Sequence, residues 1–289
     1  MALVTLKEVL KKAVPEKYAV GSFNAADHSV AEAILEVSEN LGLPVILGVA
    51  EAHFRYVHLE SFVPFLRKRI EGLRTPVVLH LDHGLSLDSI RRGLDVGFSS
   101  VMIDASSLPY EENASLTRQV VELAQKYGAS VEAELGHVAG GEGDLTDGTE
   151  PDPNVYTDPE QASSFVEDTG VHALAVAIGT VHGPYKGTPH LDLDLLAEIR
   201  SKVEIPLVLH GGSGLSKDDF QNAIAKGINK INFFTECSLE AVQAARAVLA
   251  TGTPMSYPDL IATTKSRVRE VVAKQIQIFG RNPSSEIEL

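Results

Sequence analysis

Three histidines share one local context, because each ends or closely follows an apolar run and each is followed by glycine. They are His83 in Asp82-His83-Gly84, His182 before Gly183, and His210 before Gly211. Imidazoles at the ends of separate strands can converge on one ion, and three nitrogen ligands with an open fourth position are typical of catalytic Zn²⁺. A single histidine at a strand end is more often structural, but three in the same context favour a zinc site.

Carboxylates accompany these histidines. Since neighbouring strand residues face opposite sides, we expect Asp82 to stand beside the metal as a general acid/base, or to orient a histidine, rather than to bind the ion. His80 shares the strand face of Asp82 and is expected to line the interior. Asp104, Glu132 and Glu134 lie in or at the ends of two other runs, where they predict hydrogen-bond partners or a weak second metal position.

A second candidate site is rich in glycine. Gly211-Gly212-Ser213-Gly214 allows close approach of the backbone to an anion, and a serine-capped helix begins at Ser216. Asn232-Phe233-Phe234-Thr235 ends another run with two hydrogen-bonding side chains. A glycine-rich turn is often only a turn, but its place beside the histidines predicts a phosphate site. A metal beside a phosphate suggests a phosphorylated hydroxy-ketone, with Asp82 moving the hydroxyl proton as a C–C bond breaks.

Eight short apolar runs would have to position these residues. Most are continuous rather than alternating, as in strands buried on both faces, and they recur every 23 to 43 residues. The runs are 19–24, 44–50, 76–83, 99–105, 130–136, 173–179, 206–211 and 230–235. Helical segments with capping residues and glycine stops lie between several of them. The pattern predicts a single (β/α)₈ barrel over residues 1–289, with a doubly wound open sheet as the alternative.

Two segments exceed the needs of a barrel. Residues 139–154 (AGGEGDLTDGTEPDPN) form a connection too long for an ordinary βα loop, and a mobile lid is expected there, with a tolerated surface insertion as the alternative. Residues 257–279 predict an extra C-terminal helix, which can pack on a second subunit.

Composition excludes several functions. The chain has 289 residues, 44% hydrophobic, with 25 Lys and Arg against 39 Asp and Glu, a net charge of −14. An acidic chain without a basic patch is a poor partner for nucleic acid. No run approaches the ~18 apolar residues of a membrane span, no signal peptide is evident, and one cysteine, Cys237, fits a reducing cytoplasm.

At these residues the sequence closely resembles the class II, zinc-dependent ketose-bisphosphate aldolases, which include the fructose- and tagatose-bisphosphate enzymes. The resemblance covers essentially the whole chain, through 18–24, LHLDHG (79–84), SSVMIDAS (99–106), VEAELG (131–136), AVAIGTVHG (175–183), LVLHGGSG (207–214) and KINFFTE (230–236). It implies a zinc TIM barrel, commonly a homodimer or homotetramer, that reversibly cleaves a phosphorylated ketose to dihydroxyacetone phosphate and an aldehyde.

The resemblance also assigns residues. It implies His83, His182 and His210 as zinc ligands, Asp82 as the catalytic acid/base, and Asp104 and Glu134 as positions for a second metal. Contacts to dihydroxyacetone phosphate are implied at Gly183, Gly211, Gly212, Ser213, Asn232, Phe233, Phe234 and Thr235, and Asn24 is a further candidate. Members often bind a monovalent cation, Na⁺ or K⁺, near the phosphate.

Three departures from the family pattern bear on the substrate. The lid usually reads Gly-Gly-x-Glu-Asp, whereas here Glu142 stands one place early in Gly140-Gly141-Glu142-Gly143-Asp144; it remains the candidate for moving the proton at the dihydroxyacetone carbon. Phe233-Phe234 replaces smaller or polar residues, and Ala50-Glu51-Ala52-His53 lacks a small Gly/Ser pattern. Besides tagatose or fructose 1,6-bisphosphate, a sugar-acid phosphate of the inositol-catabolite type stays open.

Other chemistries are weighed against this one. A metal-dependent hydrolase would show His-x-His on the first strand, which 19–24 lacks. A Schiff-base aldolase needs a buried lysine, but Lys186 is expected in a loop and Lys230 at the wrong end of its strand. A non-catalytic sugar-phosphate sensor is the remaining alternative.

Overall fold

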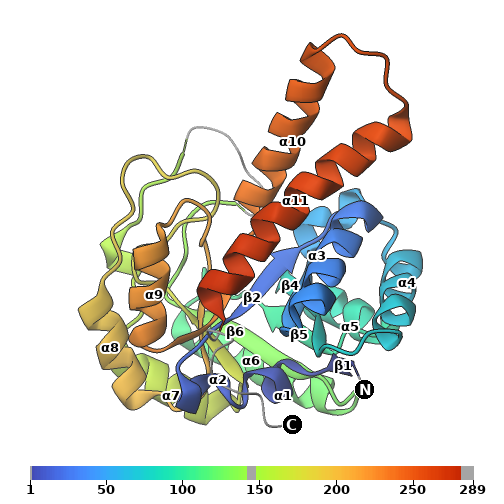
Figure 1. Cartoon of the computed structure of the whole chain (residues 1–289). Coiled ribbons are helices and arrows are strands. Elements are labelled where there is room, and N and C mark those ends of the chain that lie inside the picture. The colour runs from blue at the N-terminus through green and yellow to red at the C-terminus, as the bar shows by residue number, and fades with distance from the viewer. Residues whose placement is uncertain (1, 142–147, 281–289) are drawn as a thin grey trace.

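The computed structural model describes residues 2–141 and 148–280, which form one closed barrel of parallel strands surrounded by helices (Figure 1). Eight strands follow one another around the barrel, and pairing of β4 with β5 and of β2 with β9 closes it. The strands are β2 (Val20–Asn24), β3 (Val45–Ala50), β4 (Val77–Gly84), β5 (Ser100–Ile103), β6 (Ser130–Leu135), β7 (Ala173–Val176), β8 (Leu207–Leu209) and β9 (Ile228–Asn232). The predicted barrel is confirmed, and the open sheet is excluded.

Helices alternate with these strands on the outside. The helices are α3 (His28–Leu41), α4 (Leu59–Glu71), α5 (Leu87–Val96), α6 (Tyr110–Gln125), α7 (Pro159–Thr169), α8 (Leu193–Lys202), α9 (Lys217–Ala225), α10 (Thr235–Ala250) and α11 (Tyr257–Phe279), with 3₁₀ turns η1 (Glu51–Arg55) and η2 (Pro153–Val155). Their ends follow the local chemistry: Asp158 caps α7 with Pro159 at its first turn, and Gly42 ends α3 in the left-handed region.

The N-terminal segment closes the end of the barrel where the strands begin. It contains β1 (Leu3–Val4), which pairs with β4, and the short helices α1 (Leu6–Leu10) and α2 (Ala13–Glu16). Leu6, Leu10 and Ala13 are fully buried in a cluster with residues of the barrel strands such as Ile46 and Val78. The opposite end, where the strands finish, is therefore the mouth through which a ligand enters.

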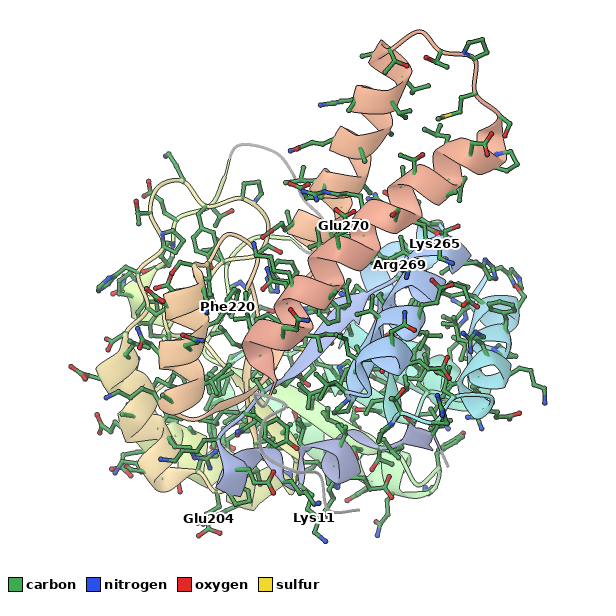
Figure 2. The ribbon with its side chains drawn as sticks, viewed as in Figure 1. Lys11, Glu204, Phe220, Lys265, Arg269 and Glu270 are labelled. Atoms are coloured by element: carbon green, nitrogen blue, oxygen red, sulfur yellow. The ribbon has the colours of Figure 1, made fainter. Side chains whose placement is uncertain are left out.

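The predicted extra helix is present as α11, and it changes surroundings along its length. Its second half carries Val272, Ile276 and Phe279 into the core, and Lys265 and Arg269 approach Glu36 of α3 at 2.6 and 3.5 Å (Figure 2). Its first half leaves the barrel together with α10, as a projecting helical hairpin (Figure 1). Across the described residues, no helix combines the length and apolar composition that a membrane crossing requires.

Candidate active site

The three histidines converge at the mouth although they come from different strand ends. His83 ends β4, His182 lies in the loop after β7, and His210 follows β8. Each offers a ring nitrogen, and these atoms lie within 4.8 Å of one another, with ring centroids 4.6–5.7 Å apart. All three are buried, and burial lowers the pKa of His182 and His210 from the ordinary value, so both rings are neutral.

Carboxylates fix the rings of two of these histidines. His83 Nδ1 lies 2.8 Å from Asp104 Oδ2, and His210 Nε2 lies 2.9 Å from Glu132 Oε1. Since a carboxylate accepts, these nitrogens carry the protons, and the lone pairs of His83 Nε2 and His210 Nδ1, 2.9 Å apart, are directed at the shared space. Neutral imidazoles that are oriented from outside in this way fit a zinc ion.

Asp82 lies in the same space, so the expected alternation is wrong at this point of β4. His83 has a φ of +46°, and the pairing of β4 with β5 slips between Leu81 and Gly84, as at a β-bulge. The left-handed residue turns the chain so that Asp82 and His83 both face the barrel interior. A side chain that moves protons and a side chain that binds metal thereby come from adjacent positions.

Two asparagines hold the fully buried carboxylate of Asp82. Asn24 at the end of β2 donates to Oδ2 at 2.8 Å, and Asn232 at the end of β9 donates to both oxygens at 3.1 and 3.2 Å. Burial raises the pKa of Asp82, but the positive charge of His83 and Lys230 outweighs it and brings the pKa well below the usual range. Asp82 is therefore ionised and ready to accept a proton. The side-chain amide of Asn232, a predicted substrate contact, donates its hydrogen bonds to the Asp82 carboxylate.

Below the mouth lies a polar layer, in which His80 lines the interior and Glu132 is a hydrogen-bond partner as the sequence predicts, while the ion pair of Glu132 with Lys230 was not predicted. Lys230 is fully buried, and its Nζ lies 2.9 and 3.0 Å from the oxygens of Glu132 and 2.7 Å from Asn232 Oδ1. His80 is also fully buried, with its Nε2 3.7 Å from both Asp82 and Glu132. Burial lowers the pKa of His80 to about 4. Burial raises that of Glu132, but Lys230 and His210 bring it to about 2.

This layer settles the question of a Schiff base. Lys230 lies inside β9, which begins two residues earlier than expected, so its placement at the wrong end of a strand is corrected. Its ammonium is held in an ion pair by Glu132, and it stands as a structural cation rather than a free amine nucleophile. Lys186 is largely exposed and pairs with Glu150 at 3.5 Å.

Removing Lys230 tests the layer. We expect Lys230→Met to lower the free energy of unfolding of the metal-free protein by about 3–5 kcal/mol, because Glu132 is left as an unpaired buried charge. The measurement is urea unfolding followed by circular dichroism. Lys230→Met combined with Glu132→Gln should recover part of the loss, and a single variant as stable as the unsubstituted protein would contradict the ion pair.

A second group of possible ligands adjoins the first. Asp104 and Glu134 lie with His83 in a cluster whose ligand atoms fall within 4.8 Å of one another. Burial and the nearby Asp104 carboxylate raise the pKa of Glu134 to about 8, while Glu134 Oε1 accepts from the Val138 amide at 2.9 Å. Two carboxyl groups crowded in a buried place are relieved by a cation, so this cluster fits the second metal position.

The glycine-rich turn lies beside the β7 loop. Gly211 has a φ of +67° and its Cα faces the backbone of Val181 so closely that any side chain would clash. The Tyr185 hydroxyl donates to the Gly211 carbonyl at 2.7 Å.

Gly183, Ser213 and Thr235 line a cavity of about 340 Å³, and Ser213 Oγ accepts from the Glu236 amide in the first turn of α10. Three predicted phosphate contacts therefore share one space near a helix N-terminus.

The two phenylalanines after β9 differ. The Phe233 ring is buried against Phe23, Phe220 and Phe279, so any contact of Phe233 with substrate comes from its backbone. Phe234 packs on His53 of η1, with ring centroids 4.6 Å apart. His53 is buried; burial lowers its pKa from the ordinary value, against the attraction of Asp82. His53 and Phe234 thus form an aromatic wall close to Asp82.

The connection after β6 is anchored on the β7 loop at two points. Ala139 pairs with Val181, and Thr149 pairs with Tyr185. The His182 amide donates to the Ala139 carbonyl at 2.8 Å. The long insertion therefore approaches the histidine cluster, while Glu142, its proposed catalytic residue, lies outside the described residues.

Comparison with known proteins identifies the family. The model of class II fructose-bisphosphate aldolases matches residues 4–283. The chain belongs to this family. It is therefore a class II aldolase, a carbon–carbon lyase of a family that is zinc-dependent in general, and the resemblance noted in the sequence is confirmed.

Individual relatives cover nearly all of this aldolase. Fructose-bisphosphate aldolase from Staphylococcus aureus (strain Mu50) is 42% identical over 287 residues, covering 97% of this chain and 98% of its own. The Geobacillus stearothermophilus fructose-bisphosphate aldolase is 41% identical over 284 residues, with the same coverage. The crystal structure of the YdjI aldolase from Escherichia coli K12 superposes with a TM-score of 0.87 at 32% identity, covering 98% of this chain and all of that one.

Proposed function

We propose that this aldolase reversibly cleaves a phosphorylated ketose, of the fructose or tagatose 1,6-bisphosphate type, to dihydroxyacetone phosphate and an aldehyde. The observation that carries the proposal is the convergence of His83, His182 and His210 around one space, with an ionised Asp82 beside them. The names of the relatives at 41–42% identity support the bisphosphate substrate.

Zinc is the proposed cofactor, held by His83, His182 and His210. When bound, it supplies Lewis acidity for the negative charge that develops on the substrate oxygens as the C–C bond breaks. The cluster of His83, Asp104 and Glu134 is proposed as a weaker second metal position, and Na⁺ or K⁺ near the phosphate belongs to the same proposal.

Asp82 is the proposed base in cleavage and acid in synthesis. Its carboxylate takes the proton from the hydroxyl of the departing aldehyde half and returns it in the reverse direction. Asn24 and Asn232 favour the ionised form and fix its orientation. Glu142 is proposed to move the proton at the dihydroxyacetone carbon.

The phosphate of the ketose is proposed to bind at the glycine-rich turn. Gly183, Ser213 and Thr235 line the cavity there, and Gly211 and Gly212 precede Ser213 in the same turn. Backbone amides of this turn and of the first turn of α10 are the proposed donors. Local amides are needed because the net charge of −14 repels an anion at longer range.

The aromatic wall of His53 and Phe234 favours a second substrate class. His53 lies near enough to Asp82 for the carboxylate to act on its pKa, and its buried Nδ1 has no hydrogen-bond partner among the described residues, so it can bond a polar or carboxylate-bearing tail. A sugar-acid phosphate is therefore the alternative to a bisphosphate.

A retro-aldol screen tests the function. The zinc-loaded protein is supplied with phosphorylated ketoses that differ in configuration at C4 and in tail charge, and dihydroxyacetone phosphate is measured. Cleavage of bisphosphates with preference for one C4 configuration is expected. Exclusive cleavage of carboxylate-tailed ketoses would move the proposal to the sugar acids, and binding of ketose phosphates without cleavage would contradict the proposed substrates. Borohydride added with substrate should trap no covalent adduct.

The projecting hairpin supports assembly with a second copy of the chain. From residue 238 to 267 no side chain is buried, and Leu249 and Tyr257 are 59% and 74% exposed. Two helices that contact only each other bury too little apolar surface to be stable alone. A homodimer or homotetramer is proposed, in the cytoplasm, where reducing conditions suit the single buried Cys237.

Charges placed on the hairpin should dissociate the oligomer. We expect Leu249→Glu with Tyr257→Glu to halve the mass of the particle or reduce it further, by light scattering, because two charges are forced into an apolar interface. Leu108→Glu, at a 41% exposed leucine between β5 and α6, is the control that should not change the mass. An unchanged mass in the hairpin variant, or an unsubstituted protein that is monomeric, would contradict this assembly.

A further inference from the structure

A chain of hydrogen bonds leads from the loops after β5 and β6, at the rim of the mouth, to the candidate zinc ligand His83. His137, two residues beyond β6, places Nδ1 2.9 Å from Ser106 Oγ. Ser106 Oγ lies 2.7 Å from Asp104 Oδ1, and Asp104 Oδ2 lies 2.8 Å from His83 Nδ1. We propose that His137 and Ser106 are positioning residues, which hold Asp104 in the orientation that prepares His83 to bind zinc.

The direction of each bond in this chain follows from the groups that form it. A carboxylate accepts, so Ser106 gives its single hydroxyl proton to Asp104, and the Ser106 amide adds a second bond to the same oxygen at 3.2 Å. Ser106 then has only lone pairs for His137, which must donate from Nδ1. At the other end, His83 donates from Nδ1 to Asp104, so its Nε2 lone pair is left for the metal. The hydrogen bonds along these four residues thus specify one tautomer for each histidine, with the proton on Nδ1 of both His137 and His83.

The order of the groups also excludes a nucleophilic serine. In a hydrolase triad the histidine takes the serine proton and the carboxylate lies behind the histidine. Here the carboxylate takes the serine proton and the histidine donates to the serine oxygen. Ser106 is therefore a link between two side chains and not an attacking group.

This chain of hydrogen bonds also determines which groups Asp104 contacts. Both of its oxygens are engaged, Oδ1 by Ser106 and Oδ2 by His83. While His137 and Ser106 hold this arrangement, Asp104 supports His83 as a ligand of the three-histidine site. Loss of the outer links should therefore weaken zinc binding at the three histidines.

The outer end of this hydrogen-bond chain can be altered without changing any of the three histidines. Ser106 and His137 line a cavity of about 1,240 Å³ that extends to Tyr156 and Asp192, on the α6 and α7 side of the barrel. His137 is only half-buried, so a side chain of similar size is tolerated there. His190 lines the same cavity but is exposed and lies outside the chain of bonds, so it provides a matched control.

The inference rests on the proposed zinc centre and is tested by zinc affinity, which needs no turnover. The full-length protein is titrated with Zn²⁺ in competition with a chromophoric chelator. We expect His137→Leu and Ser106→Ala each to weaken zinc binding roughly 10-fold, at the low end of effects measured for residues that orient metal ligands. The double variant should be no weaker than Ser106→Ala, because both changes break one chain.

Conservative variants separate positioning from general damage. His137→Asn keeps a donor near the place of Nδ1, and Ser106→Thr keeps the hydroxyl, so both should bind zinc within about 3-fold of the unsubstituted protein, as should His190→Leu. The positioning role of His137 and Ser106 would be overturned, and the zinc centre left standing, by any of three results. These are a His137→Leu variant that binds zinc as tightly as the unsubstituted protein, additive losses of zinc affinity in the double variant, or equal losses in the conservative variants. An unsubstituted protein that binds no zinc would overturn the zinc centre together with it.

Discussion

Replacement of Asp82 by alanine is expected to lower kcat by roughly 10²–10⁴-fold, the range attributed to one positioned acid/base. The carboxylate is the proton acceptor proposed for the substrate hydroxyl, and no other described carboxylate is held by Asn24 and Asn232. The measurement is the steady-state rate of ketose cleavage, with zinc content determined in the same sample.

Zinc should remain bound in Asp82→Ala, because the three imidazoles form their cluster without Asp82. KM should change much less than kcat, since the phosphate is held at the glycine-rich turn. Asp88→Ala, at an exposed aspartate in the first turn of α5, is the matched control and should be fully active. Turnover unchanged by Asp82→Ala would exclude Asp82 as the acid/base.

Removal of zinc is expected to lower the cleavage rate at least about 100-fold, because the charge developing on the substrate oxygens then lacks its Lewis acid. Dialysis against a chelator followed by assay is the measurement, and added Zn²⁺ should restore the rate. Mg²⁺ should not, since three imidazoles suit zinc and not a hard cation that prefers oxygen.

The corresponding variant is His182→Ala, which removes a ring lying 4.7 and 5.7 Å from those of His83 and His210. Zinc stoichiometry and cleavage should fall together, whereas His58→Ala, at an exposed histidine before α4, should alter neither. Full activity of protein shown to be free of zinc would reject the metal mechanism.

The barrel could be predicted because its signals are local. Continuous apolar runs mark strands covered on both faces, and residues such as Gly42, Asp158 and Pro159 mark helix ends. The gathering of His83, His182 and His210 follows from the rule that parallel strands bring their carboxyl ends to one rim. The start of β9 was misplaced by two residues, because Ile228-Asn229 precedes the apolar run and pairing with β8 decides it.

The polar interior left a signal that we applied to His80 and Asp82 but not to Lys230. His80 and Asp82, Glu132 and Glu134, and Lys230 and Asn232 are pairs of polar residues two apart in otherwise apolar strands. A period of two places both members on one face, and only the interior of the barrel can supply partners for so many charges. The contact between Ser106 and His137 had no such signal, since 31 residues separate them and loop geometry joins them.

The left-handed backbone at His83 has a consequence for protein engineering. A regular strand presents only alternate side chains to one face. Copying the three histidines onto another barrel would therefore reproduce the metal site without the acid/base Asp82 beside it. A design that keeps both the metal site and the acid/base also needs the irregular pairing of β4 with β5 between Leu81 and Gly84. The unit to be grafted is therefore residues 81–84 together with the neighbouring strand β5.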